Sequence, residues 1–415
     1  MRTLAVAWFL AVRQVKRSNM WTTILIVCIM ALTFLNLVVV GGILIGLPVG
    51  ATLAYNRQYS GDVLLRSLPT KEYIDGSDAL LRSIPSFTEV SGISPRYIGH
   101  GVVEANYKNA VGPKQDSESL SAIISGIDPL REDMVTQIGS RMLEGEMLKS
   151  GEEGYVMIGK NLLAQYTIGV GVISDSVLTG VKTGERIRIT INGNQSEYIV
   201  KGVLGSKIPE VSTRIFMSDI EMRRLLGRTD RNVGEIAIRL RPGADSALVK
   251  HDLKELGAGA SARVETSREA QGAGLDDIEK TFTILSRVIG GIGLLVASIT
   301  VFIVIFINAV TRRKYIGILK GIGISPSAIE ISYVFQSIFY ATLGASIGLV
   351  VVYVFLAPYF LLHPIDFPFA DGVLLVPYVG TFIQAGILIA VTLIAGYFPA
   401  RLIVGKNTLD SILGR

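Results

Sequence analysis

Two short patterns in this sequence are typical of catalytic sites. Gly154-Tyr-Val-Met-Ile-Gly159-Lys160 matches the first seven positions of a loop that holds nucleotide phosphates through backbone N–H groups and a lysine. Asn161 stands where such a loop has the Ser or Thr that holds magnesium, so we do not predict phosphate binding. Gly344-Ala-Ser346-Ile-Gly348 matches the turn that exposes a nucleophilic serine, but that turn joins a strand to a helix. Here the pattern lies within a long apolar run, which does not predict catalysis.

Metal and proton chemistry have equally little support. His100, His251 and His363 are too few and too scattered to predict a metal site. The long apolar runs contain no Asp or Glu, whereas ion-driven transporters usually need charges inside the membrane. The single cysteine, Cys28, lies in an apolar run and allows no intrachain disulfide. We therefore predict a chain that is not an enzyme and has no metal or cofactor of its own.

The apolar residues are concentrated in four blocks. Only 18% of the residues are charged and the mean hydropathy is +0.47, whereas an average soluble domain is roughly 25% charged. Each block exceeds the ~20 residues that a helix needs to cross a bilayer. We expect transmembrane helices at 21–50, 282–311, 330–357 and 376–400. The predicted fold class is a membrane α-helical protein with a large extracytoplasmic mixed α/β domain between the first and second spans.

Basic residues near the span ends predict the orientation, because Lys and Arg resist translocation. They lie before the first span, between the second and third spans, and after the fourth span: Arg2, Arg13, Lys16, Arg17, Arg312, Arg313, Lys314, Lys320, Arg401, Lys406 and Arg415. The short loop at 358–375 has no Lys or Arg. Both termini, the tail at 401–415 and the connection at 312–329 are therefore expected in the cytoplasm. Residues 1–20 predict an amphipathic helix at the membrane interface rather than a cleaved signal peptide.

The segment at 51–281 is expected outside the cytoplasm as an α/β domain with a stalk. Its strand-like runs include 155–158 and 234–240, and the run at 186–204 predicts a β-hairpin around Asn192-Gly193-Asn194. Helical spacing is weak at 71–82, stronger at 218–226 and strongest at 244–256. A further helix from about Ser267 is expected to run as a stiff stalk toward the second span.

Small residues inside the spans predict faces where helices approach closely. On the third span these residues are Ala341, Gly344, Ala345 and Gly348. We expect similar roles for Gly290, Gly291 and Gly293 in the second span and for Gly386 in the fourth. The same Gly344 and Ser346 pattern that resembles a nucleophile turn is thus better explained by packing.

The connection between the second and third spans predicts a short amphipathic helix. It combines a basic cluster with apolar Ile316, Ile318, Leu319 and Ile322. Ser325 and Pro326 provide cap and first-turn chemistry for the next helix. A surface loop that obeys the charge rule explains the basic residues, but it does not explain the ordered apolar stripe. The complete predicted site comprises Arg312, Arg313, Lys314, Tyr315, Ile316, Gly317, Ile318, Leu319, Lys320, Gly321, Ile322 and Gly323.

This stretch resembles the signature R-x-E-I-G-I-L-K-A-L-G of the MacB/FtsX-type permeases of ABC transporters. Tyr315 stands where the family usually has Glu, and Gly321 where it often has Ala. Tyr397-Phe-Pro399-Ala400-Arg401, followed by Thr408-Leu-Asp-Ser-Ile-Leu, is similar to the family's carboxyl-terminal elements. Ser125-Gly-Ile-Asp128 and Gly145-Glu-Met-Leu are similar to its G-V-D and G-R-x-L elements.

The resemblance implies a permease that dimerises, with itself or with a homologue, and recruits a separate cytoplasmic ABC ATPase, which binds the ATP and magnesium. In the family the loop helix docks on this ATPase, and the outer domain moves as ATP binds. The expected location is the inner membrane of a prokaryote, with lipids and an extracytoplasmic adaptor as further partners and no nucleic acid. Cargoes in the family include macrolides, peptides, haem, lipids and lipoproteins. The alternative is a non-transporting membrane receptor or scaffold.

Overall fold

The computed structural model describes residues 2–107, 118–167, 177–363, 365–367, 371–372 and 374–405. The chain divides into two compact units. We call residues 1–49, 277–365 and 372–415 the helical unit, and residues 50–276 with 366–371 the sheet domain. Each unit has a buried apolar core of its own.

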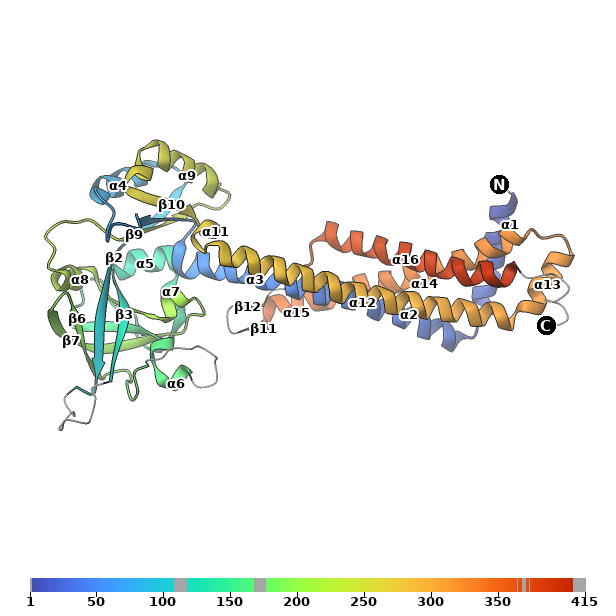
Figure 1. Cartoon of the computed structure of the whole chain (residues 1–415), viewed down its shortest axis with the longest axis horizontal. Coiled ribbons are helices and arrows are strands. Elements are labelled where there is room, and N and C mark those ends of the chain that lie inside the picture. Colours follow the sequence, from blue (N-terminus) through green and yellow to red (C-terminus); the bar gives the residue numbers. More distant parts are fainter. Residues whose placement is uncertain are drawn as a thin grey trace. The chain divides into compact units, whose positions relative to one another are not determined.

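The helical unit is built from long helices joined by short connections (Figure 1). These helices are α1 (Arg2–Lys16), α2 (Met20–Leu35), α3 (Gly41–Tyr55), α12 (Ala273–Thr311), α13 (Arg313–Gly321), α14 (Pro326–Val350), α15 (Ala357–Leu362) and α16 (Tyr378–Val404). The part of α3 from residue 50 onward and the part of α12 up to residue 276 belong to the sheet domain. π-helical turns at Asn36–Val40, Asn56–Ser60 and Val351–Leu356 continue α2, α3 and α14 without a break. A short two-stranded sheet pairs β11 (Ile365–Asp366) with β12 (Asp371–Gly372).

Four helical segments of the described chain are long and apolar enough to cross a membrane: Met20–Ser60, Asp276–Thr311, Pro326–Leu362 and Tyr378–Val404. Asn19 caps the start of the first segment, because its side chain accepts a hydrogen bond from the Trp21 N–H group at 3.0 Å. The helix extends beyond the predicted span at 21–50: it continues to Ser60 and stops at Gly61, where φ is +63°. At 1.5 Å per residue its 41 residues span roughly 60 Å, about twice the hydrocarbon thickness of a bilayer.

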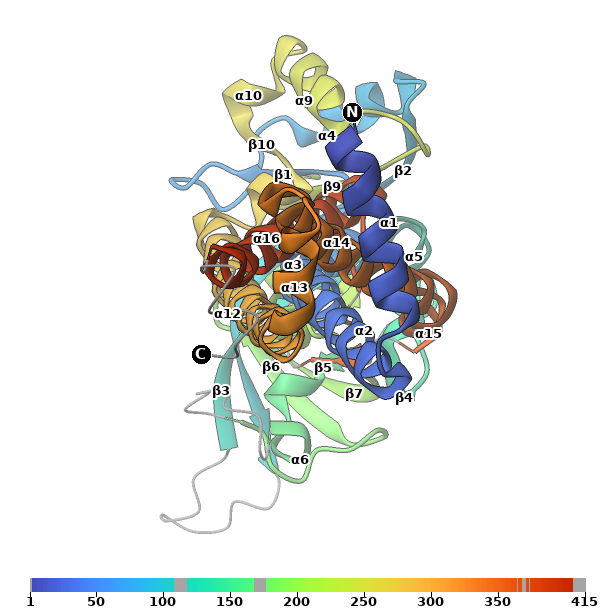
Figure 2. The same cartoon turned by 90° about the vertical axis from the view of Figure 1, so that its right-hand side faces the viewer.

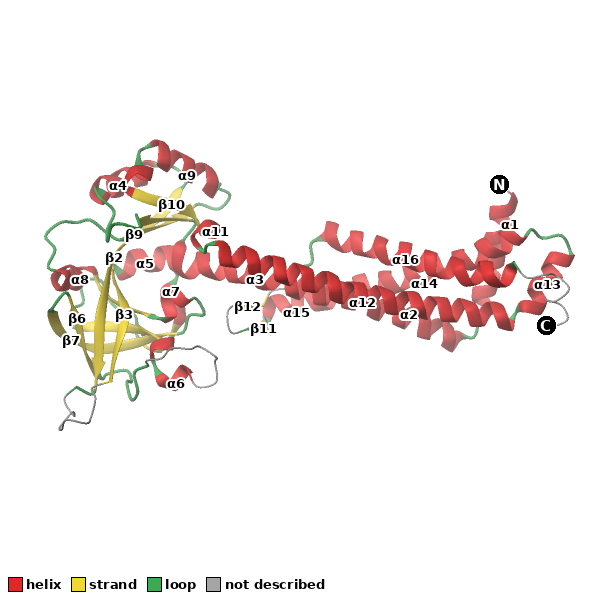
Figure 3. Cartoon of the chain, viewed as in Figure 1, coloured by secondary structure: helices red, strands yellow, loops and turns green. Residues whose placement is uncertain are grey.

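The sheet domain contains one ten-stranded mixed sheet. Its strands are β1 (Val63–Ser67), β2 (Val90–Ala105), β3 (Glu118–Ile127), β4 (Met142–Gly145), β5 (Tyr155–Gly159), β6 (Arg186–Ile191), β7 (Asn194–Leu204), β8 (Arg214–Ser218), β9 (Glu235–Leu240) and β10 (Ala262–Thr266). The order is β10-β1-β9-β2-β3-β8-β5-β7-β4, and β6 pairs with β2 and β7. Figure 3 shows these strands in yellow.

The long strand β2 joins two parts of this sheet. Its first half pairs with β9 as far as Arg96, and on the same edge it pairs with β6 only from Val102. The sheet therefore forks along β2. Helices cover it between the strands: α4 (Ser77–Ser83), α5 (Pro129–Thr136), α6 (Ala164–Thr167), α7 (Pro209–Ser212), α8 (Asp219–Leu226), α9 (Ser246–Glu255), α10 (Ala258–Ser261) and α11 (Ser267–Ala270).

Several local predictions for this domain are confirmed. β6 and β7 form the expected antiparallel hairpin, and its two turn residues, Asn192 and Gly193, have φ of +50° and +82°. Positive φ at both positions is what a two-residue hairpin turn of this twist requires. Helices α8 and α9 lie where the helical spacing predicts them.

Two helix predictions are wrong in extent. The helix expected at 71–82 covers only Ser77–Ser83, because Gly76 adopts a left-handed φ of +67° immediately before it. The stalk helix expected from Ser267 is interrupted at Gly272, where φ is +78°, so that α11 ends at Ala270 and α12 begins at Ala273. A capping box between Thr266 and Glu269 explains why α11 begins where it does.

Candidate coupling surface

Helix α13 follows directly on the end of α12 and is stopped by a glycine. Gly323 has φ of +93°, its N–H group donates to the Lys320 carbonyl at 3.0 Å, and the Ile324 N–H group donates to the Leu319 carbonyl at 3.0 Å. This pair of bonds is the Schellman arrangement, which satisfies carbonyls at the end of a helix and suits glycine. Ser325 occupies the cap position of α14 with Pro326 at its first turn, but the serine side chain makes no capping bond.

The apolar residues of α13 lie on two faces, not on the single stripe that the sequence suggests. Ile316 is buried and Leu319 is half-buried against the neighbouring helices. Tyr315, Ile318 and Ile322 are 69%, 52% and 70% exposed. These three follow the spacing i, i+3, i+7 and therefore share one face of the helical segment. We call them the α13 stripe. Tyr315, which stands where the signature that this stretch resembles has glutamate, thus extends an exposed apolar row.

The cations of α13 differ in their surroundings. The Lys320 ammonium donates a hydrogen bond to the Val404 carbonyl in the last turn of α16. Lys314 is exposed, whereas Arg312 and Arg313 are half-buried. Of the predicted glycines, Gly317 is buried, and a Cβ at Gly321 would meet no described atom within 4 Å. One side of α13 is thus fixed to the helical unit while the other side is open.

A groove separates α1 from α13, and Figure 2 looks onto this end of the helical unit. Its volume is about 610 Å³. The lining is mainly apolar and comes from Val6, Phe9, Leu10, Ile316, Ile318, Leu319, Ile324, Tyr315 and Tyr333, with Gln14 and three arginines, Arg13, Arg17 and Arg312. We call it the α1–α13 groove. Its lining residues on α13 include part of the α13 stripe but not Ile322.

The small residues of α14 pack closely against α2. A Cβ on Gly344 would lie 2.4 Å from Met30 Cβ, and one on Gly348 would lie 2.4 Å from Phe34 Cδ1. Ala341 is completely buried in the same unit. These distances are far below van der Waals contact, so only glycine fits at both positions.

The other predicted glycines behave differently from one another. A Cβ on Gly290 would lie 2.8 Å from Leu37 Cδ1, and one on Gly293 would lie 3.1 Å from Asn36 Oδ1. Gly291 and Gly386 have no described atom within 4 Å of an added Cβ, so they mark no helix contact within the described chain. Sequence analysis missed Gly396, where an added Cβ would lie 1.9 Å from Ser337 Oγ.

The sheet domain holds the end of the first helical run through a buried ionic cluster. Tyr59 lies between two guanidinium groups, with Arg96 Cζ 4.7 Å and Arg214 Cζ 4.9 Å from the ring centroid. The Tyr59 hydroxyl donates to Glu235 Oε1 at 2.6 Å and accepts from Arg214 Nη2 at 2.9 Å. We call Tyr59, Arg96, Glu132, Arg214 and Glu235 the Tyr59 joint. All five side chains are buried.

The charges of the Tyr59 joint are matched. Glu132 receives two hydrogen bonds from Arg96, at 2.7 and 2.8 Å, and a third from Ser94 at 2.6 Å. Glu235 forms ion pairs with Arg96 and Arg214, each at 3.3 Å. Burial alone would raise the pKa of Glu235, but Arg214 and Arg96 outweigh it and lower this pKa to about 2. Glu235 is therefore ionised over the whole physiological pH range.

A second contact ties the same helical run to the residues before α12. Arg66 Nη2 donates to the Tyr55 hydroxyl at 2.9 Å and to the Ala270 carbonyl at 2.6 Å. The Ser60 hydroxyl donates to Ser267 Oγ at 2.7 Å. The two segments that enter the sheet domain are thus bonded to each other inside it.

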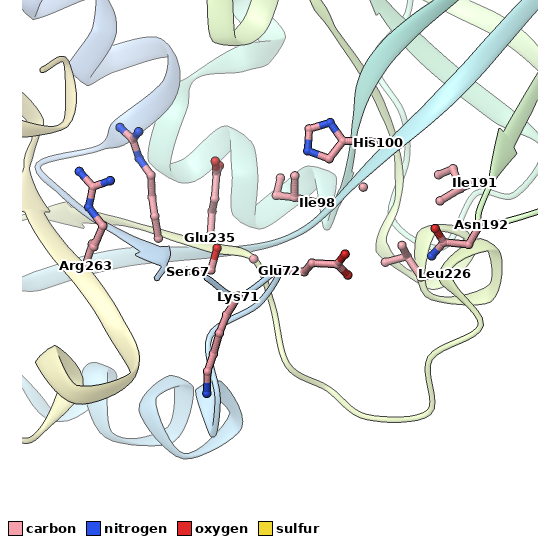
Figure 4. A pocket seen from close by; sticks show the side chains of 13 residues that line it. Ser67, Lys71, Glu72, Ile98, His100, Ile191, Asn192, Leu226, Glu235 and Arg263 are labelled. Carbon is pink, nitrogen blue, oxygen red and sulfur yellow. The ribbon is translucent and has the colours of Figure 1, made fainter. Parts of the chain in front are cut away.

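A pocket of about 340 Å³ lies at the fork of the sheet, lined among others by Ile98, His100, Glu72 and Asn192 (Figure 4). Its cations are paired, Lys71 with Asp75 and both Arg66 and Arg263 with Glu265. Within the described chain each of these cations thus already has a carboxylate partner, although Arg66 and Arg263 share one, so the pocket is a weak candidate for an anionic ligand.

The rejected catalytic patterns have ordinary structural roles. Residues 155–159 of the phosphate-loop pattern form β5, and the Gly154 N–H group donates to Glu221 Oε1 at 2.9 Å instead of facing a loop cavity. Ser346 lies within α14. The described residues contain no group of three His, Cys, Asp or Glu side chains that could hold a metal ion.

Comparison with known protein families agrees with this architecture. The MacB-like periplasmic core domain matches residues 23–256, more than half of the 415 residues. The FtsX-like permease C-terminal domain matches residues 287–408. The chain belongs to the MacB/FtsX-type permease family. This permease is therefore a multi-pass membrane protein with an extracytoplasmic domain, of the type found in ABC transporters.

A solved structure is also similar to this permease. The periplasmic region of MacB from Actinobacillus actinomycetemcomitans is 13% identical, with a TM-score of 0.34. The match covers 50% of this chain and 89% of that one. Among curated proteins, none matches the chain.

The remaining family elements of the permease occupy turns and helix ends. Gly145 has φ of +74°, and an added Cβ would lie 2.1 Å from the Lys201 carbonyl, which requires glycine. Asp128 caps α5 by accepting from the Leu130 N–H group at 3.1 Å. Pro399 and Ala400 are buried in α16. The predicted element that begins at Thr408, like Lys406 and Arg415, lies outside the described residues.

Sequence analysis missed the Tyr59 joint. Its members come from five separate elements, and no short motif connects them. One signal was present: Ser94 and Arg96 occupy alternate positions of β2, so that a charged and a polar side chain point to the same face. A cluster of this kind becomes visible only when the sheet order is known.

Proposed function

We propose that this permease docks a separate cytoplasmic ATPase on α13 and transmits ATP-driven movement to its sheet domain. The observation that carries the proposal is the α13 stripe. Three large side chains in a row are exposed on a short cationic helix, and exposed apolar rows of this kind mark protein interaction sites. Aromatic residues such as Tyr315 are enriched at the centres of such interfaces.

The attachment of α13 supports a role in transmitting force. The Lys320 to Val404 hydrogen bond attaches α13 to the last turn of α16, and Ile316 is buried in the same apolar cluster as residues of α14 and α16. A load applied to the α13 stripe would therefore move these helices together with α13. A flexible surface loop would absorb such a load instead.

The orientation follows from the charge rule. With the basic residues around α1 and α13 in the cytoplasm, both termini lie inside and residues 51–281 lie outside. ATP and magnesium then belong to the partner ATPase, and this chain needs no cofactor of its own. The expected setting is the inner membrane of a prokaryote.

The continuity of two helical segments supports transmission to the sheet domain. The first segment runs unbroken from Met20 to Ser60 and ends in the Tyr59 joint. The second, α12, is continuous over 39 residues. Together with a second permease copy or a homologue, these helices would convert ATPase closure into movement outside the membrane. The work done is export or extraction of a substrate such as a lipoprotein, lipid, peptide, haem or antibiotic, with an adaptor where one is needed.

The test is co-purification of the full-length permease with the ATPase encoded beside it, with ATP hydrolysis measured on the complex. Ile322→Asp should weaken the complex at least tenfold, because a charge would enter an apolar contact. The matched control is Leu248→Asp, which changes a leucine that is 65% exposed on α9 of the sheet domain. Equal binding by both variants would refute docking on α13. Normal binding with ATP hydrolysis indifferent to Ile322→Asp would favour the receptor or scaffold alternative.

A further inference from the structure

We propose that the α1–α13 groove binds one anionic phospholipid, with hydrocarbon against its apolar lining and the phosphate held by Arg13, Arg17 and Arg312. The groove has a volume of about 610 Å³, within the range of about 300–1,000 Å³ typical of small-molecule sites. This proposal does not rest on ATPase docking and is tested separately from it.

The position of the groove along the chain favours a lipid. Arg312 follows Thr311, the last residue of α12, and Tyr333 lies two turns inside α14. The groove therefore lies at the ends of two apolar spans, at the depth where headgroups meet hydrocarbon. On α1, the large apolar side chains of Phe9 and Trp8 are both 59% exposed. An amphipathic helix of this kind lies in the membrane interface.

The charge of the groove selects an anion. Arg13, Arg17 and Arg312 line it together with no acidic side chain, and none of them forms an ion pair with a described carboxylate. Arginine binds phosphate through two parallel N–H···O bonds, and clustered basic residues between helices attract anionic headgroups. An acidic protein segment would satisfy the cations, but it would leave the apolar lining in contact with polar backbone.

The hydroxyl group of Tyr333 independently indicates a ligand in the groove. Its side chain is only 1% exposed, it lines the groove, and its hydroxyl is buried without a hydrogen-bond partner among the described residues. Buried hydroxyl groups normally have a partner. A phosphate or ester oxygen of a lipid in the groove would accept this hydrogen bond.

The experiment uses the full-length permease, delipidated in detergent and incubated with phosphatidylglycerol, phosphatidylcholine or inorganic phosphate. Bound lipid is counted by native mass spectrometry over a concentration series. The permease should retain one phosphatidylglycerol at least tenfold more tightly than phosphatidylcholine. Inorganic phosphate at the same concentration should not displace it, because phosphate lacks the hydrocarbon.

The variants separate the site from general charge effects. Arg13→Gln with Arg17→Gln should weaken phosphatidylglycerol retention at least tenfold. The control, Lys314→Gln with Arg401→Gln, removes the same charge from residues outside the groove lining and should leave retention unchanged. Tyr333→Phe removes only the hydroxyl group and should weaken retention several-fold at an unchanged unfolding temperature.

Two results would overturn the proposal. One is equal retention by the arginine pair variant and its control, which would mean that any surface charge suffices. The other is displacement by inorganic phosphate, which would leave an anion site without a lipid. Ile322→Asp should retain the lipid even if it loses the ATPase, since Ile322 does not line the groove. Failure of docking is therefore distinguishable from failure of the lipid site.

Discussion

The α13 stripe and the Tyr59 joint use similar residues in opposite ways. Each has a tyrosine near cationic side chains, but the stripe exposes Tyr315 and two isoleucines on the cationic helix α13, whereas the joint buries two arginines and two glutamates around Tyr59. Burial makes the joint costly to break, because each charge left behind would lose its partner away from water. Exposure makes the stripe free to gain and lose a contact. One region is suited to an exchangeable contact and the other to a permanent one.

The largest expected effect on stability is at the centre of the joint. Arg96→Ala leaves Glu132 without its bidentate partner, which should cost about 3–5 kcal/mol because an uncompensated carboxylate stays buried. Hydrogen exchange of the β2 and β9 amides in the full-length chain measures the loss locally. Arg186→Ala is the control, since Arg186 pairs with Glu197 at the exposed surface and should cost about 1 kcal/mol or less. Comparable losses would mean that the joint has no special role.

A smaller effect is expected when only the hydroxyl of the joint is removed. Tyr59→Phe keeps the ring between the two guanidinium groups but loses bonds to Glu235 and Arg214. Hydrogen bonds to charged groups contribute about 1.5–3 kcal/mol each before relaxation, so we expect a loss within that range. Tyr59→Leu removes the ring as well and should cost more. The measurement is the unfolding temperature of the full-length chain in detergent, and equal losses would show that the cation–ring contacts contribute nothing.

Acidification should weaken the joint through Glu235. Its pKa falls from an ordinary value of 4.5 to about 2 in the folded chain, so the folded state favours the charged form. The stability that this provides is present above pH 4.5 and is lost as the pH falls through about 2. The unfolding temperature of the permease should therefore decline over this interval. In the Glu235→Gln variant the unfolding temperature should change less over this pH interval. If the variant showed the same pH dependence as the original chain, the loss of stability could not be due to Glu235.

The features that could be predicted from the sequence are those that depend on residues close together along the chain. The hairpin at Asn192-Gly193 and the end of α13 at Gly323 were predictable, because each follows from residues that are neighbours in the sequence. The length of the first helical run was not, since Gly50 does not break it and the Tyr59 joint holds its far end. Likewise, the sequence suggested that Ile316 and Ile318 belong to one stripe, although residues two positions apart in a helix point roughly 200° apart around its axis. Which of them is buried depends on α14 and α16.

The smallest expected effect on stability belongs to the α13 stripe itself. Ile322 is 70% exposed, so Ile322→Asp should change the free energy of unfolding by less than about 0.5 kcal/mol, as is usual for surface positions. Ile316 is 2% exposed on the opposite side of α13, and Ile316→Asp should cost several kcal/mol because a charge would enter an apolar core. The measurement is the unfolding temperature of each variant in detergent, compared with that of the original chain. If Ile322→Asp destabilised the chain as much as Ile316→Asp, the stripe would belong to the folded core and would not be available to a partner. A stable Ile322→Asp variant that loses ATPase binding would show that this apolar row contributes to docking and not to folding.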